Sequence, residues 1–252
     1  MKKILTFIFA IITILTTTFI LASCGGNQLV IAIPNDPTNE ARALLLLEQT
    51  EIITLKDGAG LNATIKDIES NPYRIKFKEV EAVQLPLVLD SVDYAVINSN
   101  YAIPANLNPV TDALAIESAT SFYSNILAVK KGNENTLKIK ALVAALESLQ
   151  VKEFITSEYG GAVVSVVENP TNGFDNSINY DELAGVKITV AASPTPHAEI
   201  LKVAKGILAQ KNITLDIKEY DDYIQPNIIV DEGEVDANYF QQSNWKMGKR
   251  PG

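Results

Sequence analysis

Arg42 is the residue whose type and position first suggest binding chemistry in this sequence. A guanidinium group can hold a carboxylate through two parallel hydrogen bonds, so an arginine near a helix N-terminus suits an anionic ligand. Residues 30–33 are apolar and mostly β-branched and predict a buried strand, whereas residues 41–48 strongly favour a helix. The turn between them therefore predicts an anion site, although a βα unit with an arginine in a surface ion pair explains the same residues.

The turn itself carries signals for a helix start. Asp36 is suited to cap the helix because its carboxylate can accept a backbone N–H. Pro37 suits the first helical position, where a backbone N–H would have no partner within the helix. We therefore expect the strand to end and the helix to begin within residues 34–37.

Residue types that support catalysis are scarce. The chain has one histidine, His197, and one cysteine, Cys24. It contains no GxSxG sequence, no glycine-rich phosphate loop and no cluster of residues at metal-ligand spacing. We therefore predict a protein that is not an enzyme and that needs no cofactor and no metal. His197 lies near a predicted helix start, and we expect a capping or surface residue there, not a ligand-binding one.

The N-terminus has the pattern of an export signal. Lys2 and Lys3 precede an apolar run over residues 4–21, and the sequence LASC follows, ending at Cys24. Small residues before a cysteine resemble the bacterial lipobox, which implies a signal peptide over residues 1–23 and a lipid such as palmitate on Cys24. A transmembrane anchor is the alternative. A single cysteine in an exported chain forms no intramolecular disulfide, which fits a lipid anchor on the extracytoplasmic face of the cell membrane.

Composition limits the size of the fold and the class of partner. With 252 residues, 47% of them hydrophobic, the chain can form one large domain or two smaller lobes. Its formal net charge is −9, and loss of Lys2 and Lys3 with the signal peptide makes it −11. An acidic chain without basic clusters predicts no binding to nucleic acid.

Two parts of the sequence resemble each other. Residues 31–38 (IAIPNDPT) align without gaps with residues 188–195 (ITVAASPT), so each part has a strand, a capping residue, Pro-Thr and a helix. Later in each part, FKE at 77–79 matches IKE at 217–219. Chance similarity of two βα units is the alternative, but the shared order favours two similar α/β lobes. Ligands of such lobes bind in the cleft outside the carboxyl ends of the strands.

Hydrophobic patterning predicts further elements. The first part is expected to contain a helix at residues 85–89 and strands at 74–80, 94–97, 113–116 and 122–130. One helix is expected over residues 137–159, before a polar segment. The second part is expected to contain helices at 197–210 and 224–230 and strands at 186–191, 213–220 and 235–238.

Several long stretches carry a family resemblance. They are PNDPTNEARALLLLE from residue 34, EAVQLPLVLDSVDYAVIN from residue 81, SPTPHAEIL from residue 193 and DYIQPN from residue 222. They resemble the methionine-binding lipoproteins of ABC importers, the NlpA family. The resemblance implies a two-lobed α/β fold of the periplasmic-binding-protein type II class. It also implies a lipid-anchored protein that captures L-methionine, or a close analogue, for the permease and ATPase subunits of an importer.

The order of the two parts differs from the order that the resemblance implies, because the family places the part like residues 187–241 first. We therefore expect a circularly permuted and incomplete chain. Its expected segments are a lipoprotein signal peptide at 1–23, a ligand-binding lobe like the family's second lobe at 24–131, a C-terminal helix that returns to the other lobe at 132–167, a linker at 168–185, and a partial lobe like the family's first lobe at 186–252.

The resemblance also implies roles for individual residues. Arg42 would hold the ligand carboxylate, and Asn98 and Asn125 would bind its amino and carboxylate groups. Tyr223 and Phe240 would wall the pocket for the thioether, which packs well against ring edges. Strand-end capping is the alternative for the two asparagines, and core packing is the alternative for the two aromatic residues.

Two positions depart from the family pattern. Trp245 falls where the family has a tyrosine and is expected to complete the binding site. Gln242 stands where relatives have a histidine.

Two other functions compete with methionine capture. One is binding of another small apolar amino acid or a peptide in the same cleft. The other is a truncated or rearranged remnant lipoprotein that keeps the motifs but cannot form a closed cleft, because deletion of strands would expose apolar faces and strand edges.

Overall fold

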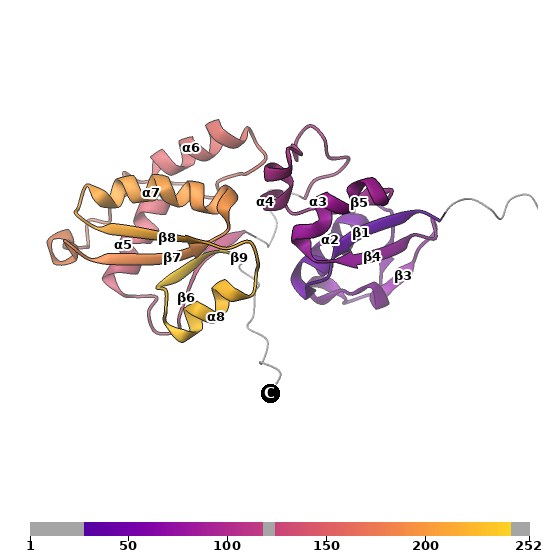
Figure 1. The fold of residues 1–252 in the computed structure, drawn as a ribbon, viewed down its shortest axis with the longest axis horizontal. Helices are drawn as coiled ribbons and strands as arrows, with labels where there is room; N and C mark the ends of the chain where they lie inside the picture. The colour runs from indigo at the N-terminus through magenta and orange to yellow at the C-terminus, as the bar shows by residue number, and fades with distance from the viewer. Residues whose placement is uncertain (1–27, 118–123, 243–252) are drawn as a thin grey trace, which may run out of the picture.

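A computed structural model of the protein describes residues 28–117 and 124–242. These residues form two α/β lobes that lie side by side (Figure 1). Residues 28–117 make up the first lobe and residues 124–242 the second. Within these two ranges, no helix combines the length and the apolar character that a membrane crossing requires.

The first lobe is organised around one parallel strand. Its sheet contains, in order, β4 (Lys76–Val80), β1 (Val30–Pro34) and β5 (Tyr94–Ala95). Ile31 and Ile33 of β1 are buried together with Leu44 of α2 (Pro37–Gln49). Ala32, between them, is buried in a separate cluster, as expected for a central strand that is covered on both faces. The strand and helix predicted around Arg42 are confirmed.

Short elements complete the first lobe: β2 (Thr54–Leu55), β3 (Ile68–Ser70), α3 (Leu85–Val88) and α4 (Ser99–Ala102). The strand predicted at residues 113–116 is wrong, because the chain there has no regular secondary structure. Leu114 is 86% exposed, so its apolar side chain lies on no buried face and gives the segment no reason to pair as a strand.

The second lobe contains a four-stranded sheet. In order, its strands are β6 (Asn125–Val129), β9 (Ala237–Gln242), β7 (Lys187–Ala192) and β8 (Thr214–Glu219), with β6 antiparallel to β9 and the other pairs parallel. Helices α7 (Glu199–Ala209) and α8 (Gln225–Glu232) cover opposite faces of this sheet (Figure 1). Val190 packs in the cluster with α7, and the next residue, Ala191, packs with Ile229 of α8. Successive side chains therefore point to opposite faces of the sheet, as the two-residue period of a β-strand requires.

The helix predicted over residues 137–159 is two helices. They are α5 (Leu137–Leu146) and α6 (Leu149–Tyr159), and both pack against α7. Ser148 separates them and caps α6 through its Oγ, which accepts a hydrogen bond from the backbone of Val151 at 3.2 Å. The backbone of Thr171 then bonds on both sides of the break, to Glu147 and Leu149. A contact 23 residues away in sequence thus fixes the position of the break.

The segment predicted as a linker, residues 168–185, is packed against the second lobe. Besides the contacts of Thr171, Ile178 and Leu183 are buried in the core of this lobe. Gly173 has a positive φ of +89° and lies so close to Ile207 of α7 that an added Cβ would be 2.8 Å from its side chain. The segment therefore has a fixed place in the lobe.

The two lobes meet at a different residue from the predicted one. The first lobe was expected to extend to residue 131, but β6 pairs along its whole length with β9 in the other sheet. The structure therefore places the boundary between Glu117 and Ser124. The strong strand signal of residues 125–129 does not depend on which sheet the strand joins, which is why the sequence pattern did not reveal its partner.

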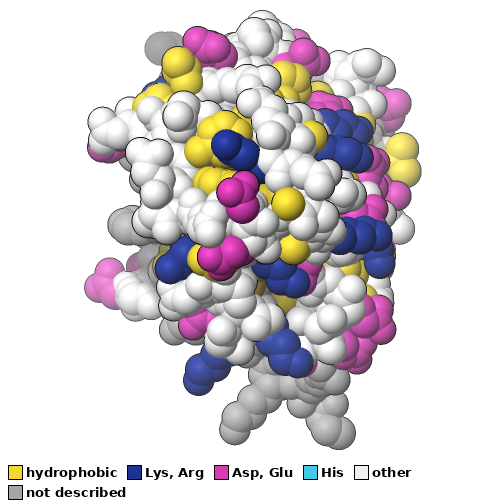
Figure 2. Space-filling model, turned by 90° about the vertical axis from the view of Figure 1, so that its left-hand side faces the viewer, with side chains coloured by type: hydrophobic (Ala, Val, Ile, Leu, Met, Phe, Trp, Pro, Cys, Tyr) yellow, Lys and Arg dark blue, Asp and Glu magenta, His cyan; other side chains and the backbone are white. Residues whose placement is uncertain are grey.

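The surface of the second lobe is mixed in charge. On the face seen in Figure 2, basic and acidic side chains alternate, and neither sign forms a continuous block. Lys187 and Asp216 of this lobe form an ion pair at 2.6 Å. Exposed pairs of this kind contribute little to stability and mainly keep the surface polar.

The contribution of the α2 N-cap to the stability of the first lobe can be tested by substitution. Asp36 Oδ1 accepts the backbone N–H of Asn39 at 3.0 Å. We expect Asp36→Ala to lower the free energy of unfolding by about 1 kcal/mol, because the first turn of the helix then loses its acceptor. Urea unfolding measures the change. Asp57→Ala, in an exposed turn, is the matched control, and equal stability of the two variants would contradict the capping role.

Candidate functional site

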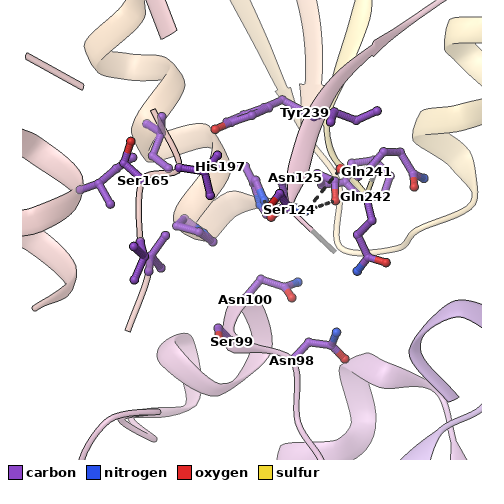
Figure 3. Close-up of a pocket in the computed structure, with 18 of the residues that line it drawn as sticks. Asn98, Ser99, Asn100, Ser124, Asn125, Ser165, His197, Tyr239, Gln241 and Gln242 are labelled. Carbon is purple, nitrogen blue, oxygen red and sulfur yellow. Dashed lines mark hydrogen bonds between the residues drawn. The ribbon is translucent and has the colours of Figure 1, made fainter. Parts of the chain in front are cut away.

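A cavity of about 1160 Å³ lies between the two lobes. Its polar wall contains residues from both sides, and Figure 3 shows the side of the first lobe facing the side of the second across the cavity. The first lobe contributes Asp36, Asn39, Arg42, Asn98, Ser99, Asn100 and Glu117, and the second contributes Ser124, Asn125, His197, Tyr223, Phe240, Gln241 and Gln242. The first-lobe residues come largely from loops and helix starts that follow β1 and β5, as expected for ligand sites in α/β folds.

Asn39 is the centre of the first-lobe wall. It is 5% exposed, and its Nδ2 donates to both carboxylate oxygens of Asp36, at 2.9 and 3.0 Å. Its Oδ1 accepts from Asn98 Nδ2 at 2.7 Å and from Arg42 Nη1 at 3.3 Å. The cap residue, the arginine and the strand-end asparagine therefore form one connected network. Asn98 is placed by this network, because its side chain makes no cap hydrogen bond to α4.

The guanidinium of Arg42 lies on the cavity wall and is paired with Glu117. Arg42 Nη2 contacts Glu117 Oε2, and Nε donates to Oε1 at 3.4 Å. The two side chains are 25% and 31% exposed. A ligand carboxylate that approaches Arg42 therefore meets a guanidinium that already holds a carboxylate. Sequence reasoning missed Glu117, because nothing in its local sequence indicates a partner 75 residues away.

The aromatic wall joins the two lobes. Tyr223 stacks on Phe240 with ring centroids 5.6 Å apart and an interplanar angle of 10°, and it lies tilted against Tyr101 at 5.4 Å. Its hydroxyl donates to Asn100 Oδ1 at 2.8 Å, and the Tyr101 hydroxyl donates to the carbonyl of Asp221 at 2.8 Å. Burial raises the pKa of Tyr101 to about 12 and the pKa of Tyr223 well above its usual value, so both hydroxyls stay neutral donors.

Asn125 and His197 form the polar wall of the second lobe. Asn125 Nδ2 donates to the carbonyl of Phe240 at 2.7 Å, and its Oδ1 lies 3.1 Å from His197 Nε2. The prediction that His197 is a capping or surface residue is wrong, because the residue is only 6% exposed and its side chain packs edge-on against Tyr239. Burial lowers its pKa to about 4, so the imidazole is neutral at pH 7.

Two buried polar atoms of the cavity wall have no hydrogen-bond partner among the described residues. They are Asn100 Nδ2, a donor from the first lobe, and Gln242 Oε1, an acceptor from the second. An unsatisfied buried polar group costs about 1–3 kcal/mol, so native proteins rarely leave one without a partner. Among the described residues, the wall therefore contains one buried donor and one buried acceptor that no protein group satisfies.

The structure brings five of the predicted site residues to this cavity: Arg42, Asn98, Asn125, Tyr223 and Phe240. Trp245 and Cys24 lie outside the described residues. Glu117 and His197 were not predicted as site residues. The sequence contained a signal for His197 only: Ser193 and His197 are four positions apart, a spacing at which two side chains can meet at a helix start.

Comparison with known proteins identifies the family. The sequence model described as NlpA lipoprotein matches residues 26–167 and 188–246. The chain belongs to the NlpA lipoprotein family. The resemblance found in the sequence is thereby confirmed. The two matched segments are separated by residues 168–187, which nearly coincide with the segment predicted as a linker.

Named relatives match about half of this chain. Membrane lipoprotein TpN32 of Treponema pallidum is 46% identical over 136 residues, which are 54% of this chain and 51% of that protein. The D-methionine-binding lipoprotein MetQ of Escherichia coli K12 is 40% identical over 141 residues, 55% of this chain and 51% of MetQ. The chain thus spans about half the length of the curated relatives it matches.

Solved structures of NlpA-like proteins share the fold. A nutrient-binding protein from Burkholderia cenocepacia bound to methionine matches with a TM-score of 0.54 and 49% identity, over 55% of this chain and 59% of that one. The methionine-binding protein MetQ matches with a TM-score of 0.53 and 38% identity, over 56% of this chain and 59% of that one. The prediction of an α/β fold like that of periplasmic methionine-binding proteins is confirmed.

Proposed function

We propose that this NlpA lipoprotein captures L-methionine, or a close analogue, in the cavity between its lobes and delivers it to the permease and ATPase subunits of an ABC importer. The observation that carries this proposal is the cavity between the lobes, which is lined by the guanidinium of Arg42 and by the side-chain amides of Asn98 and Asn125. A zwitterionic amino acid offers carboxylate oxygens to a donor and ammonium hydrogens to an acceptor. The relatives named methionine-binding supply the choice of side chain.

The chemistry of the wall suits each part of such a ligand. Arg42 is assigned to the carboxylate, because a guanidinium binds it with two charge-assisted hydrogen bonds. Asn98 and Asn125 are assigned to the amino and carboxylate groups, because an amide side chain both donates and accepts. Tyr223 and Phe240, stacked on each other, are assigned to the thioether, which interacts favourably with aromatic edges.

We propose the remaining features from the family and the sequence. The protein is a binding protein and not an enzyme, which the family assignment supports. Residues 1–23 are a signal peptide, and Cys24 carries the lipid that holds the protein at the extracytoplasmic face of the membrane. Trp245 completes the binding site. From the resemblance of the individual sequence stretches, we also propose that the two lobes stand in reversed order relative to the family.

A ligand titration tests the proposed function. We expect L-methionine to raise the melting temperature, with a stabilisation of about 2.7 kcal/mol at a hundredfold excess over the dissociation constant. D-methionine, leucine and a methionine-containing dipeptide are compared in the same assay to rank stereochemistry, side chain and length. Differential scanning fluorimetry on the folded protein measures the shift. An unchanged melting temperature in millimolar L- and D-methionine would refute the proposal and favour a remnant lipoprotein.

A further inference from the structure

Three hydrogen bonds in series connect Ser193, His197, Asn125 and the backbone of Phe240 at the edge of the cavity. The Ser193 Oγ is 2.5 Å from His197 Nδ1, His197 Nε2 is 3.1 Å from Asn125 Oδ1, and Asn125 Nδ2 is 2.7 Å from the carbonyl oxygen of Phe240. Ser193 and His197 are 5% and 6% exposed, whereas Asn125 is open to the cavity (Figure 3). The series therefore runs from the buried interior to the surface of the site.

The positions of the protons in this series follow from its last member. A carbonyl oxygen only accepts, so the Asn125 atom beside Phe240 must be the amide nitrogen. The amide oxygen then faces His197, and Nε2 must carry the proton that it donates to this oxygen. In a neutral imidazole Nδ1 is then an acceptor, and the Ser193 hydroxyl donates to it. One tautomer alone satisfies all three contacts.

We propose that His197 is a positioning residue for the ligand: together with the carbonyl of Phe240, its Nε2–H holds the amide of Asn125 in the orientation that the ligand requires. This inference rests on the proposed function, in which Asn125 binds the amino acid. Both ring nitrogens of His197 are engaged within the protein, so the residue acts through Asn125. Asn125 itself keeps one oxygen lone pair and a second N–H, whose contact with the Gln241 carbonyl, at 3.4 Å, is long for a hydrogen bond.

The packing around His197 supports this role. Tyr239 lies edge-on to the imidazole, with ring centroids 5.3 Å apart and an interplanar angle of 88°. Ser193 follows β7 directly and His197 lies before α7, so both are held by the buried end of the lobe. Burial lowers the pKa of His197 to about 4, which keeps the ring in the neutral form that the hydrogen bonds need. A freely turning amide would present donor and acceptor to the ligand in two arrangements, and one of them would repel a carboxylate.

Nitrogen NMR tests the proton positions directly, because His197 is the only histidine of the chain. In protein labelled with 15N-histidine, we expect at pH 7 one protonated and one unprotonated ring nitrogen, with the proton on Nε2. A proton on Nδ1, or an imidazolium ring, would overturn the inference. This measurement needs no ligand, so it is independent of the proposed function.

Affinity measurements test the role in binding. His197→Phe keeps an aromatic ring beside Tyr239 but has no donor, and we expect it to bind L-methionine about tenfold more weakly than the wild type. His197→Gln places an amide N–H near the position of Nε2, and we expect its affinity within about threefold of the wild type. Equal affinity of His197→Phe and the wild type, at equal helical content, would overturn the positioning role. A wild-type protein that binds no methionine would overturn the proposed function, and this role with it.

A further variant decides the question if His197→Phe does not fold. Ser193→Ala removes the hydroxyl that donates to Nδ1 and so weakens the preference for the Nε2–H tautomer, which then depends on Asn125 alone. We expect a population of the Nδ1–H tautomer in its NMR spectrum and affinity about threefold weaker. A changed tautomer with unchanged affinity would show that the orientation of Asn125 does not matter to the ligand.

Discussion

Arg42→Ala is expected to weaken the binding of L-methionine by about 2–5 kcal/mol, which is at least about thirtyfold. The substitution removes the proposed charge-assisted hydrogen bonds to the ligand carboxylate. It also leaves Glu117 without its cation at the same wall of the cavity, so that a negative charge faces a negatively charged group. Both effects act in the same direction.

Two further variants separate these effects. Arg42→Lys keeps the charge but loses the planar pair of donors, and we expect it to bind with an intermediate affinity. Glu117→Gln keeps Arg42 and removes the competing carboxylate, so its affinity is expected to equal or exceed that of the wild type. Isothermal titration calorimetry measures all three, and urea unfolding checks that the folds are equally stable. Wild-type affinity in Arg42→Ala would exclude Arg42 as the carboxylate ligand.

Acid is expected to destabilise the second lobe through His197 by about 3 kcal/mol. The imidazole has a pKa of about 4 in the folded protein and about 6.5 in the unfolded chain. Between these two values the unfolded chain binds more protons than the folded one, so stability falls as the pH falls from about 6.5 to about 4. Above about 6.5 both states are neutral and the contribution of His197 no longer changes with pH.

The comparison with His197→Phe isolates this contribution, because the carboxylates that also titrate in acid are common to both proteins. We expect the stability advantage of the wild type over the variant to shrink by about 3 kcal/mol between pH 7 and pH 4. Urea unfolding at a series of pH values measures the difference. A difference that stays constant over this range would show that the imidazole is not held neutral in the folded protein.

Local sequence signals predicted the elements around Arg42 well. The β-branched apolar residues at 30–33, the capping residue Asp36 and the helix formers that follow act within one turn or one strand, and each appears in the structure as expected. The same holds for β7, α7 and β8. Predictions failed where distant contacts decide the structure. Helix α5 ends at Leu146 and Ser148 caps the start of α6, where Thr171 bonds to the residue on each side of Ser148, and no periodicity within residues 137–159 contains that information.

The candidate site shows the same limit. The family resemblance assigned Arg42, Asn98, Asn125, Tyr223 and Phe240, and the structure places all five around one cavity. Their assigned roles in binding remain predictions. The pairing of Arg42 with Glu117 and the contact of His197 with Asn125 each join residues more than 70 positions apart. Such pairs depend on the topology of two lobes, which the composition of a short segment does not encode.

The single crossing of the chain between the lobes has a consequence for affinity. Within residues 28–117 and 124–242, the chain passes from one lobe to the other once, between Glu117 and Ser124. Arg42 and Asn98 lie on one side of this crossing, and Asn125 and Phe240 lie on the other. In the proposed binding mode, the covalent connection would keep the second set of contacts at a high effective concentration for a ligand that the first set already holds. For the proposed ligand, the dissociation constant would therefore be a property of the connected pair, and two individually weak half-sites would suffice for capture.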